Sequence, residues 1–229
     1  MSEPILHRAD RRGLADEAAD RIRDAIFDGA FEPGSALREV DLAAGLGVSR
    51  GSVREGLGRL EREGLIRTAW HRGTRVVDVT PADIEEVYAL RAALDRLASV
   101  TAHQNAGDRQ LADLDRLVAD LQSAVDSDAG GAVLVRLDLA FHDAVYAAAR
   151  NSRLTTAWTA IRSQVHLFQL RRVELALDHY RTRVGAEHRQ LAELIRDGDP
   201  AKLAQAAESH VHSARRGLLA DLEPGAHGS

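Results

Sequence analysis

The sequence of 229 residues contains no cysteine, a single lysine and few aromatic residues, which make up 4% of the chain. The absence of cysteine excludes disulfides, thiolate nucleophiles and cysteine-ligated zinc. No apolar run approaches the ~18 to 20 residues that a membrane span needs, and residues 1–12 lack the apolar stretch of a signal peptide. These absences favour a soluble, cytoplasmic protein that does not span a membrane.

Charge is nearly balanced over the whole chain but is unevenly distributed. There are 30 basic and 35 acidic residues, a net charge of -5, which by itself argues weakly against a partner as anionic as DNA. Residues 37–77 differ from this average, because they hold eight arginines and five acidic residues and so carry +3. Binding of nucleic acid would therefore depend on individually placed arginines in this segment.

The first third of the chain has the pattern of a small helical domain with a hairpin. Apolar residues recur at helical spacing over 14–26, and a short helix fits 39–46. Ser49 is a good N-cap for a further helix that ends at Gly64, and two short strands are expected around a loop that contains Gly73. The order is helix, helix, turn, helix and hairpin.

The segment around Ser49 has the chemistry of a helix-turn-helix. The first turn of its helix exposes Arg50, Ser52 and Arg54, which suit the major groove, because arginine can fork onto guanine and hydroxyls with helix N-terminal amides can hold phosphate. The hairpin tip, His71-Arg72-Gly73, resembles a wing that can reach a minor groove or phosphates. The alternative for the helix alone is a solvated amphipathic helix with exposed arginines.

From Thr80 onward the pattern predicts helices only. Thr80, Pro81 and Asp83 form an N-cap arrangement that opens the first helix, and five amphipathic stretches follow at about 108–127, 131–150, 153–179, 183–197 and 200–221. A break is expected near Gly185, and residues 223–229 are expected to be disordered. The predicted fold is mainly α: an N-terminal winged helix-turn-helix with a small β-hairpin wing, then an antiparallel all-α bundle of six or seven helices.

Four residues of the bundle form a candidate metal set. Asp138 and His142 lie four residues apart on one helix face, while His188 and His210 fall in register with apolar residues of their own helices and should point inward. One carboxylate with three imidazoles suits a divalent metal, zinc first, with nickel, cobalt, manganese or iron as alternatives. The alternative is that each histidine is a hydrogen-bonded core residue.

The N-terminal segment resembles the winged helix of GntR-family transcription regulators. The resemblance rests on Phe31 to Glu39, Leu42-Ala43, Leu46 to Arg50, Val53-Arg54-Glu55, Leu57, Leu60 and Glu63-Gly64-Leu65. It implies that Arg38, Arg50, Arg54 and Gly73 contact DNA. Ser49, Ser52, His71 and Arg72 are the further DNA-contact candidates that the residue pattern gives. One departure is Gly51-Ser52, where such members usually carry Thr-Pro.

Residues 81–222 resemble the FCD ligand-binding domain of the FadR subfamily. The matching pieces are Val87 to Asp95, Asp138 to His142 with Asn151 following, Glu187-His188-Arg189, Asp197-Gly198-Asp199 and Ser209-His210-Val211. The resemblance implies that Asp138, His142, His188 and His210 hold a divalent metal completed by a small carboxylate effector, with Arg91 facing the effector. Arg91 could instead form a surface ion pair with Asp95, and Arg150 stands where a glycine commonly precedes Asn151.

Together the two resemblances predict an effector-responsive regulator rather than an enzyme. Residues 1–79 would bind DNA, residues 80–222 would bind the effector and dimerise, and residues 223–229 would form the tail. We expect a homodimeric repressor that binds a palindromic operator and is released by a small organic acid. A metal-dependent enzyme acting on a small carboxylate, or a regulator with a purely structural metal, are the alternatives.

Overall fold

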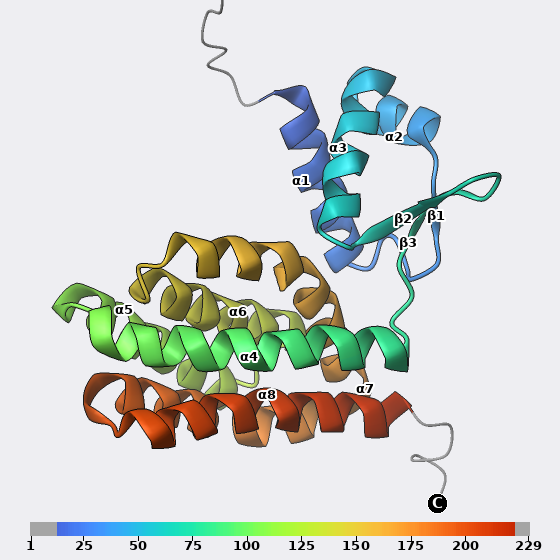
Figure 1. Cartoon of the computed structure of the whole chain (residues 1–229). Helices are drawn as coiled ribbons and strands as arrows, with labels where there is room; N and C mark the ends of the chain where they lie inside the picture. The colour runs from blue at the N-terminus through green and yellow to red at the C-terminus, as the bar shows by residue number, and fades with distance from the viewer. Residues whose placement is uncertain (1–12, 223–229) are drawn as a thin grey trace, which may run out of the picture. The chain divides into compact units, whose positions relative to one another are not determined.

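The protein divides into two compact units between Asp78 and Val79. The structure, a computed structural model, describes residues 13–222, so the tail predicted at 223–229 lies outside the described residues. Figure 1 shows a helical N-terminal unit with a small sheet, and a C-terminal unit built from long helices. The mainly α fold expected from the sequence is confirmed.

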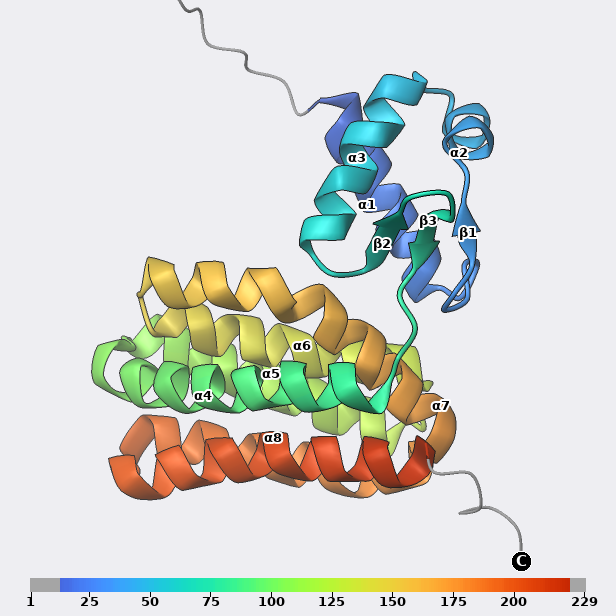
Figure 2. The ribbon, with the colours of Figure 1, turned by 45° about the vertical axis from the view of Figure 1, so that its right-hand side comes forward.

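The N-terminal unit follows the order predicted from the sequence. Its helices are α1 (Leu14–Phe27), α2 (Glu39–Leu46) and α3 (Arg50–Arg62), and its strands are β1 (Ala36–Leu37), β2 (Ile66–Ala69) and β3 (Gly73–Val76). The strands form one antiparallel sheet in the order β1, β3, β2, visible in the turned view of Figure 2. The sequence predicted the β2–β3 hairpin but not β1, which is two residues long.

Two glycines set the helix-turn-helix geometry. Gly47, between α2 and α3, has a φ of 67°, a left-handed conformation that favours glycine. Gly56 lies where α3 crosses α1, and a Cβ there would come within 2.9 Å of the Ala15 carbonyl oxygen. The crossing is therefore as close as a residue without a side chain permits, and it fixes the direction in which α3 presents its first turn.

The C-terminal unit contains the five helices α4 (Pro81–Asn105), α5 (Asp108–Asp126), α6 (Gly131–Ala148), α7 (Ser152–Asp197) and α8 (Pro200–Leu222) among the described residues. Thr80 caps α4 by accepting from the Asp83 amide, as predicted, and Asn151 caps α7. Arg150, at the position where a glycine was expected, has a φ of 50°, so it holds the left-handed conformation that glycine adopts without strain.

Helix α7 differs from its prediction in the place of its break. The sequence favoured two helices separated near Gly185, yet Gly185 is buried and helical. The non-helical residue is Ala176, with φ -147° and ψ 56°, and it divides the 46 residues of α7 into two helical halves. Glycine at 185 serves packing instead, because a Cβ there would meet the Gln122 side chain at 2.6 Å.

Apolar side chains fill the interior of the helical unit, and a polar cluster lies among them. Large buried side chains include Trp158, Tyr88, Tyr146 and Phe168, while Asp138 and Arg91 have no exposed surface. Buried charge is expensive unless it is paired or binds a ligand, so this cluster marks a candidate site. No helix within residues 13–222 is long and apolar enough to cross a membrane.

Candidate functional site

The first turn of α3 presents the polar residues that the sequence assigned to DNA. The Ser49 hydroxyl caps the helix by accepting from the Ser52 amide, with 3.1 Å between oxygen and nitrogen. Arg50 and Arg54 are both largely exposed, and both lie beside Glu39 of α2. Arg54 donates from Nε and Nη2 to the two Glu39 oxygens at 2.8 and 2.7 Å. The Ser49 cap and the two hydrogen bonds from Arg54 to Glu39 together hold this turn in place.

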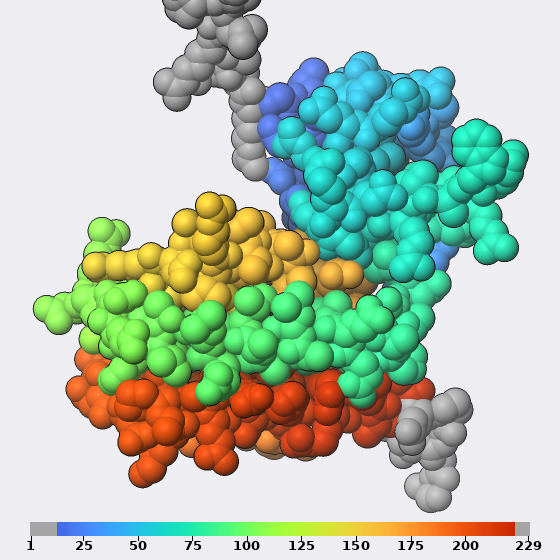
Figure 3. Space-filling model, in the orientation of Figure 1, coloured from blue at the N-terminus to red at the C-terminus, as the bar shows by residue number. Residues whose placement is uncertain are grey.

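The remaining predicted DNA residues lie at the start of α2 and at the hairpin tip. Arg38 is the exposed residue that precedes α2, and His71, Arg72 and Gly73 are exposed in the β2–β3 turn. Figure 3 shows this turn as a protrusion of the N-terminal unit. Sequence reasoning omitted Trp70, which is 88% exposed at the same tip and stands edge-on to the His71 ring at 5.1 Å between centroids.

In the C-terminal unit, Asp138, His142, His188 and His210 are brought together. One ligand atom from each lies within 4.8 Å of the others. Asp138 and His142 come from α6, His188 from α7 and His210 from α8, and all four are buried. Asp138 and His142, expected on one helix face, are 0% and 3% exposed.

Each imidazole uses its Nδ1 hydrogen on a partner that can only accept. His188 Nδ1 donates to the Val184 carbonyl at 2.7 Å, and His210 Nδ1 donates to a Glu187 oxygen at 2.9 Å. His142 Nδ1 faces a carboxylate oxygen of Asp95 at 3.3 Å. In a neutral imidazole the other nitrogen then carries a lone pair, so each Nε2 atom can act as a ligand, although His142 Nε2 also accepts from Arg91 Nη2 at 2.9 Å.

The three Nε2 atoms lie close to one another and to Asp138. His142 Nε2 and His210 Nε2 are 3.3 Å apart, and His188 Nε2 lies 3.0 Å from Asp138 Oδ1. Both His188 Nε2 and Asp138 Oδ1 are buried without a hydrogen-bond partner. Four acceptor atoms facing a common point fit a cation with nitrogen and oxygen ligands, so the donor set fits a divalent metal.

Burial keeps the His142 and His210 imidazoles neutral at neutral pH. It lowers the pKa of His142 well below the ordinary value of 6.5, and the adjacent Arg91 guanidinium lowers it further. Burial likewise lowers the pKa of His210 below 6.5, although its hydrogen bond to Glu187 acts in the opposite direction. Neutral imidazoles are the form that binds metals, because a proton and a metal compete for the same lone pair.

Arg91 lies inside this cluster rather than on the surface. It is 0% exposed, its Nε is 3.3 Å from Asp95, and its Nη2 donates to His142 Nε2 at 2.9 Å. Its Nη1 is buried without a partner. The expected pair with Asp95 therefore exists but is buried, and the guanidinium keeps one unused donor beside the candidate metal ligands.

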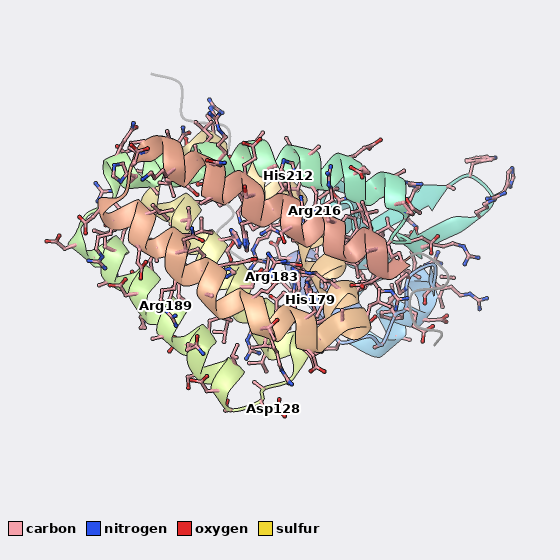
Figure 4. The ribbon with its side chains drawn as sticks, turned by 90° about the horizontal axis from the view of Figure 1, so that it is seen from below. Asp128, His179, Arg183, Arg189, His212 and Arg216 are labelled. Carbon is pink, nitrogen blue, oxygen red and sulfur yellow. The ribbon has the colours of Figure 1, made fainter. Side chains whose placement is uncertain are left out.

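A groove between α7 and α8 leads from solvent to His210. It has a volume of about 460 Å³, and its lining includes Arg183, Glu187, Lys202, Ser209 and His210. Figure 4 looks onto α7 and α8, with Arg183 and His179 on α7 and His212 and Arg216 on α8. The groove gives the buried cluster a polar approach that carries two cationic side chains.

Sequence reasoning missed two residues that orient the imidazoles. Glu187 holds His210, and Asp95, which also accepts from the Tyr146 hydroxyl at 2.7 Å, faces His142. Glu187 directly precedes His188, and Asp95 lies four residues after Arg91, so both stand next to predicted site residues. Carboxylates adjacent to candidate ligands in the sequence are the signal that could have identified them.

The exposed arginine-bearing helix and wing, with a separate helical unit that holds a buried polar cluster, are the features of a DNA-binding transcription regulator. Two family models match the chain: the gntR family of bacterial regulatory proteins over residues 14–76, and the FCD domain over residues 86–213. The chain belongs to the GntR family and carries an FCD domain, and it is a transcription regulator rather than an enzyme.

Curated relatives and solved structures agree with this family. An HTH-type regulator of Mycobacterium tuberculosis (strain ATCC 25618 / H37Rv) is 32% identical over 228 residues, 91% of each chain. The probable D-xylose utilization operon transcriptional repressor of Paenarthrobacter nicotinovorans is 29% identical over 89% of this chain and 88% of its own. A putative GntR regulator from Rhodococcus sp. RHA1 superimposes with a TM-score of 0.72 at 25% identity, covering 91% of this chain and 99% of that one. E. coli McbR/YncC, at 20% identity, shares the fold with a TM-score of 0.79, covering 93% and 100%.

Proposed function

We propose that the protein is a homodimeric repressor that is released from a palindromic operator by a small organic acid bound at a divalent metal. Residues 1–79 would bind DNA and residues 80–222 would bind the effector and dimerise, in the cytoplasm, where the operator is. One observation carries this proposal: one ligand atom from each of Asp138, His142, His188 and His210 lies within 4.8 Å of the others in a buried site. Zinc is the first candidate, with nickel, cobalt, manganese or iron as alternatives.

For DNA, the proposal assigns base contacts to the first turn of α3. Arg50 and Arg54 would reach base edges, and Ser49 and Ser52 would hold phosphate at the helix N-terminus. Arg38, His71, Arg72 and Gly73 would position the protein on the backbone or in the minor groove. The exposed Trp70 extends this wing contact.

For the effector, the proposal assigns recognition of a carboxylate to Arg91. A bound divalent metal would supply a positive centre that accepts a carboxylate oxygen in an open position. His142 Nε2 cannot accept from Arg91 and coordinate a metal at the same time, since both use one lone pair. Loading the site would therefore release the Arg91 guanidinium, which already has an unpartnered Nη1, to pair with the incoming acid.

Two features support dimerisation and repression. Leu90 and Leu97 lie seven residues apart on α4, and both are about half exposed, so they form an apolar stripe suited to a second copy. One relative of similar length is described as a repressor of a sugar utilization operon. If the acid preferred the released state about 100-fold, DNA affinity would fall about 100-fold, a coupling of ~2.7 kcal/mol.

The test starts from the zinc-loaded full chain. Duplexes that it binds are selected from random DNA at moderate salt, and their affinity is then measured with and without small mono- and dicarboxylates. We expect a palindromic preference and weaker binding with an effective acid. Selection of no preferred sequence would contradict DNA recognition, whereas an acid-independent affinity together with a metal-raised Tm would assign the metal a purely structural role.

A matched pair of variants places the metal. His210→Ala removes a proposed ligand, while His212→Ala removes a half-buried histidine two residues further along α8 that is absent from the cluster. We expect His210→Ala to lose the metal and the response to acid, and His212→Ala to keep both. Equal metal content in the two variants would contradict the assigned ligand set.

A further inference from the structure

A second arginine lies inside the helical unit without a carboxylate partner. Arg172 of α7 is 5% exposed, and within residues 13–222 no acidic side chain forms an ion pair with it. Its contacts are a long hydrogen bond from Nη1 to Gln169 at 3.5 Å and the face of the Tyr180 ring, 5.0 Å from the guanidinium carbon. A buried cation with so few polar partners is costly, which suggests that an anion completes it.

Tyr180 adds an unused donor to the same corner. The residue is 2% exposed, and its hydroxyl is buried without a hydrogen-bond partner. Eight residues of regular helix would place Arg172 and Tyr180 ~12 Å apart along the axis. The non-helical Ala176 stands between them and interrupts that spacing. The break in α7 at Ala176 therefore lies between the two residues whose guanidinium and ring are in contact.

This corner is connected to the candidate metal ligands through Gln169. The Gln169 amide donates to Asp138 Oδ2 at 3.2 Å, and its oxygen lies 3.5 Å from both Arg172 Nη1 and the Tyr88 hydroxyl. Arg91 also lies near Tyr88, with 5.7 Å between its guanidinium carbon and the ring centroid. Two buried guanidinium groups are therefore connected to the cluster, Arg91 directly and Arg172 through Gln169, each with unused hydrogen-bonding capacity nearby.

The buried charges indicate what kind of acid fits. Among the described residues, the buried arginine and carboxylate side chains are Arg91, Arg172, Asp95 and Asp138, two of each sign, so their formal charges sum to zero. A divalent metal raises this sum to +2. One monocarboxylate would leave +1 inside the bundle, whereas a dianion would neutralise it.

We propose that the effector is a small acid with two negatively charged groups, one directed to the metal and Arg91, and the other to Arg172 and the Tyr180 hydroxyl. This inference rests on the proposed function, because it requires an acid bound at the metal. It adds a second anion-binding corner, built by Arg172 and Tyr180, to the carboxylate site assigned to Arg91. The second group is a carboxylate or a phosphate, which share this chemistry.

The experiment measures acid binding to the zinc-loaded full chain by calorimetry, with matched pairs of acids. Lactate and malate differ by a second carboxylate, and glycerate and 3-phosphoglycerate differ by a phosphate. We expect the member of one pair that carries two acidic groups to bind ~10- to 100-fold more tightly, as charge-assisted hydrogen bonds contribute. The pair that shows the difference identifies the second group.

Variants then assign the difference to this corner. Arg172→Gln should reduce the ratio within that pair to less than ~3-fold while leaving the affinity for the singly charged acid unchanged, and Tyr180→Phe should reduce it in part. Arg171→Gln, at an exposed position of the same helix, is the control and should keep the ratio. If Arg172→Gln does not fold, Tyr180→Phe and the wild-type ratios decide.

The outcomes separate this inference from the proposed function. Equal affinity within both pairs, or an Arg172→Gln variant that weakens the singly and doubly charged acids equally, overturns the two-group effector but keeps acid binding. If none of the four acids binds the zinc-loaded chain, the proposed effector site and this inference both fail.

Discussion

His210 donates its Nδ1 hydrogen to Glu187 across the α7–α8 interface, with 2.9 Å between nitrogen and oxygen. Arg183 pairs with the other oxygen of the same carboxylate at 2.6 Å. Burial raises the pKa of Glu187, but the hydrogen bond from His210 and the charge of Arg183 act together in the opposite direction, so the pKa lies below the ordinary value of 4.5 and the group is ionised at neutral pH. Glu187 therefore fixes the ring with its Nε2 lone pair toward the cluster.

Replacing Glu187 by glutamine should weaken metal binding without unfolding the protein. Loss of such an outer carboxylate typically lowers metal affinity ~10- to 100-fold, because the imidazole is less basic and less firmly oriented. The measurement is competition with a metal chelator. Glu193→Gln, at an exposed position of α7, is the control and should bind metal like the wild type. An unchanged affinity in Glu187→Gln would show that His210 is not a ligand.

The metal-free protein should lose stability as the pH falls below about 6.5. Burial lowers the pKa of His142 and His210 below the ordinary value, and it lowers the pKa of His166 to about 4. As the pH falls through about 6.5, these histidines are protonated in the unfolded chain but stay neutral in the folded chain. The free energy of unfolding therefore falls with falling pH until the folded-state pKa values are reached. Above about pH 6.5 these imidazoles are neutral in both the folded and the unfolded state, so they contribute no pH dependence to the free energy of unfolding.

This pH dependence is read from Tm of the chelator-treated protein between about pH 5 and pH 8. His166→Gln should flatten the decline in part, whereas His179→Gln, at an exposed position, should leave it unchanged. A Tm that stays constant over the range would mean that the buried imidazoles take up protons in the folded state. Protons should not compete with the metal for His142 and His210 between about pH 8 and pH 6.5.

The features that could be predicted from the sequence are those set by neighbouring residues. Ser49 and Gly47 act within one turn of their own positions, and helical register is enough to direct His188 and His210 inward. Contacts between distant segments could not be predicted. Glu187 meets His210 across 23 residues, and nothing in the local sequence of Ala176 marks it as the break in α7.

The two hydrogen bonds from Arg54 to Glu39 could not be predicted for the same reason, because they join α3 to α2 across 15 residues. The sequence assigned Arg54 to DNA from its place in the first turn of α3, and the structure adds that Glu39 already holds its guanidinium. This carboxylate sits beside Arg50 as well, 3.6 Å away. An acidic residue beside arginines that are proposed to contact DNA disfavours nonspecific binding, which agrees with the net charge of -5.

Arg54→Ala should remove sequence preference and keep the fold. The side chain is 67% exposed, and ion pairs at such sites contribute only ~0 to 1 kcal/mol of stability. A base contact by arginine discriminates by ~1 to 3 kcal/mol, so affinity for the selected duplex should fall ~5- to 150-fold while random DNA is bound as before. Fluorescence anisotropy measures both affinities.

Arg62→Ala is the matched control for this variant, because Arg62 is an exposed arginine in the last turn of the same helix. It should alter binding of selected and random DNA by the same small factor. Glu39→Gln should change DNA affinity in the opposite direction. Because it removes a negative charge beside Arg50 and Arg54, it should raise affinity for random DNA. Preserved discrimination in Arg54→Ala would move the base contacts away from the first turn of α3.

Trp70 at the wing tip should contact the operator and report on binding. Its indole is 88% exposed, and burying part of it against the duplex would contribute ~1 to 2 kcal/mol, so Trp70→Ala should weaken operator binding ~5- to 30-fold. The chain has two tryptophans, and Trp158 is buried against Tyr146 in the other unit. An operator-induced change in emission should therefore vanish in Trp70→Phe and persist in Trp158→Phe. If Trp70→Ala binds the operator as tightly as the wild type, the wing tip does not touch DNA.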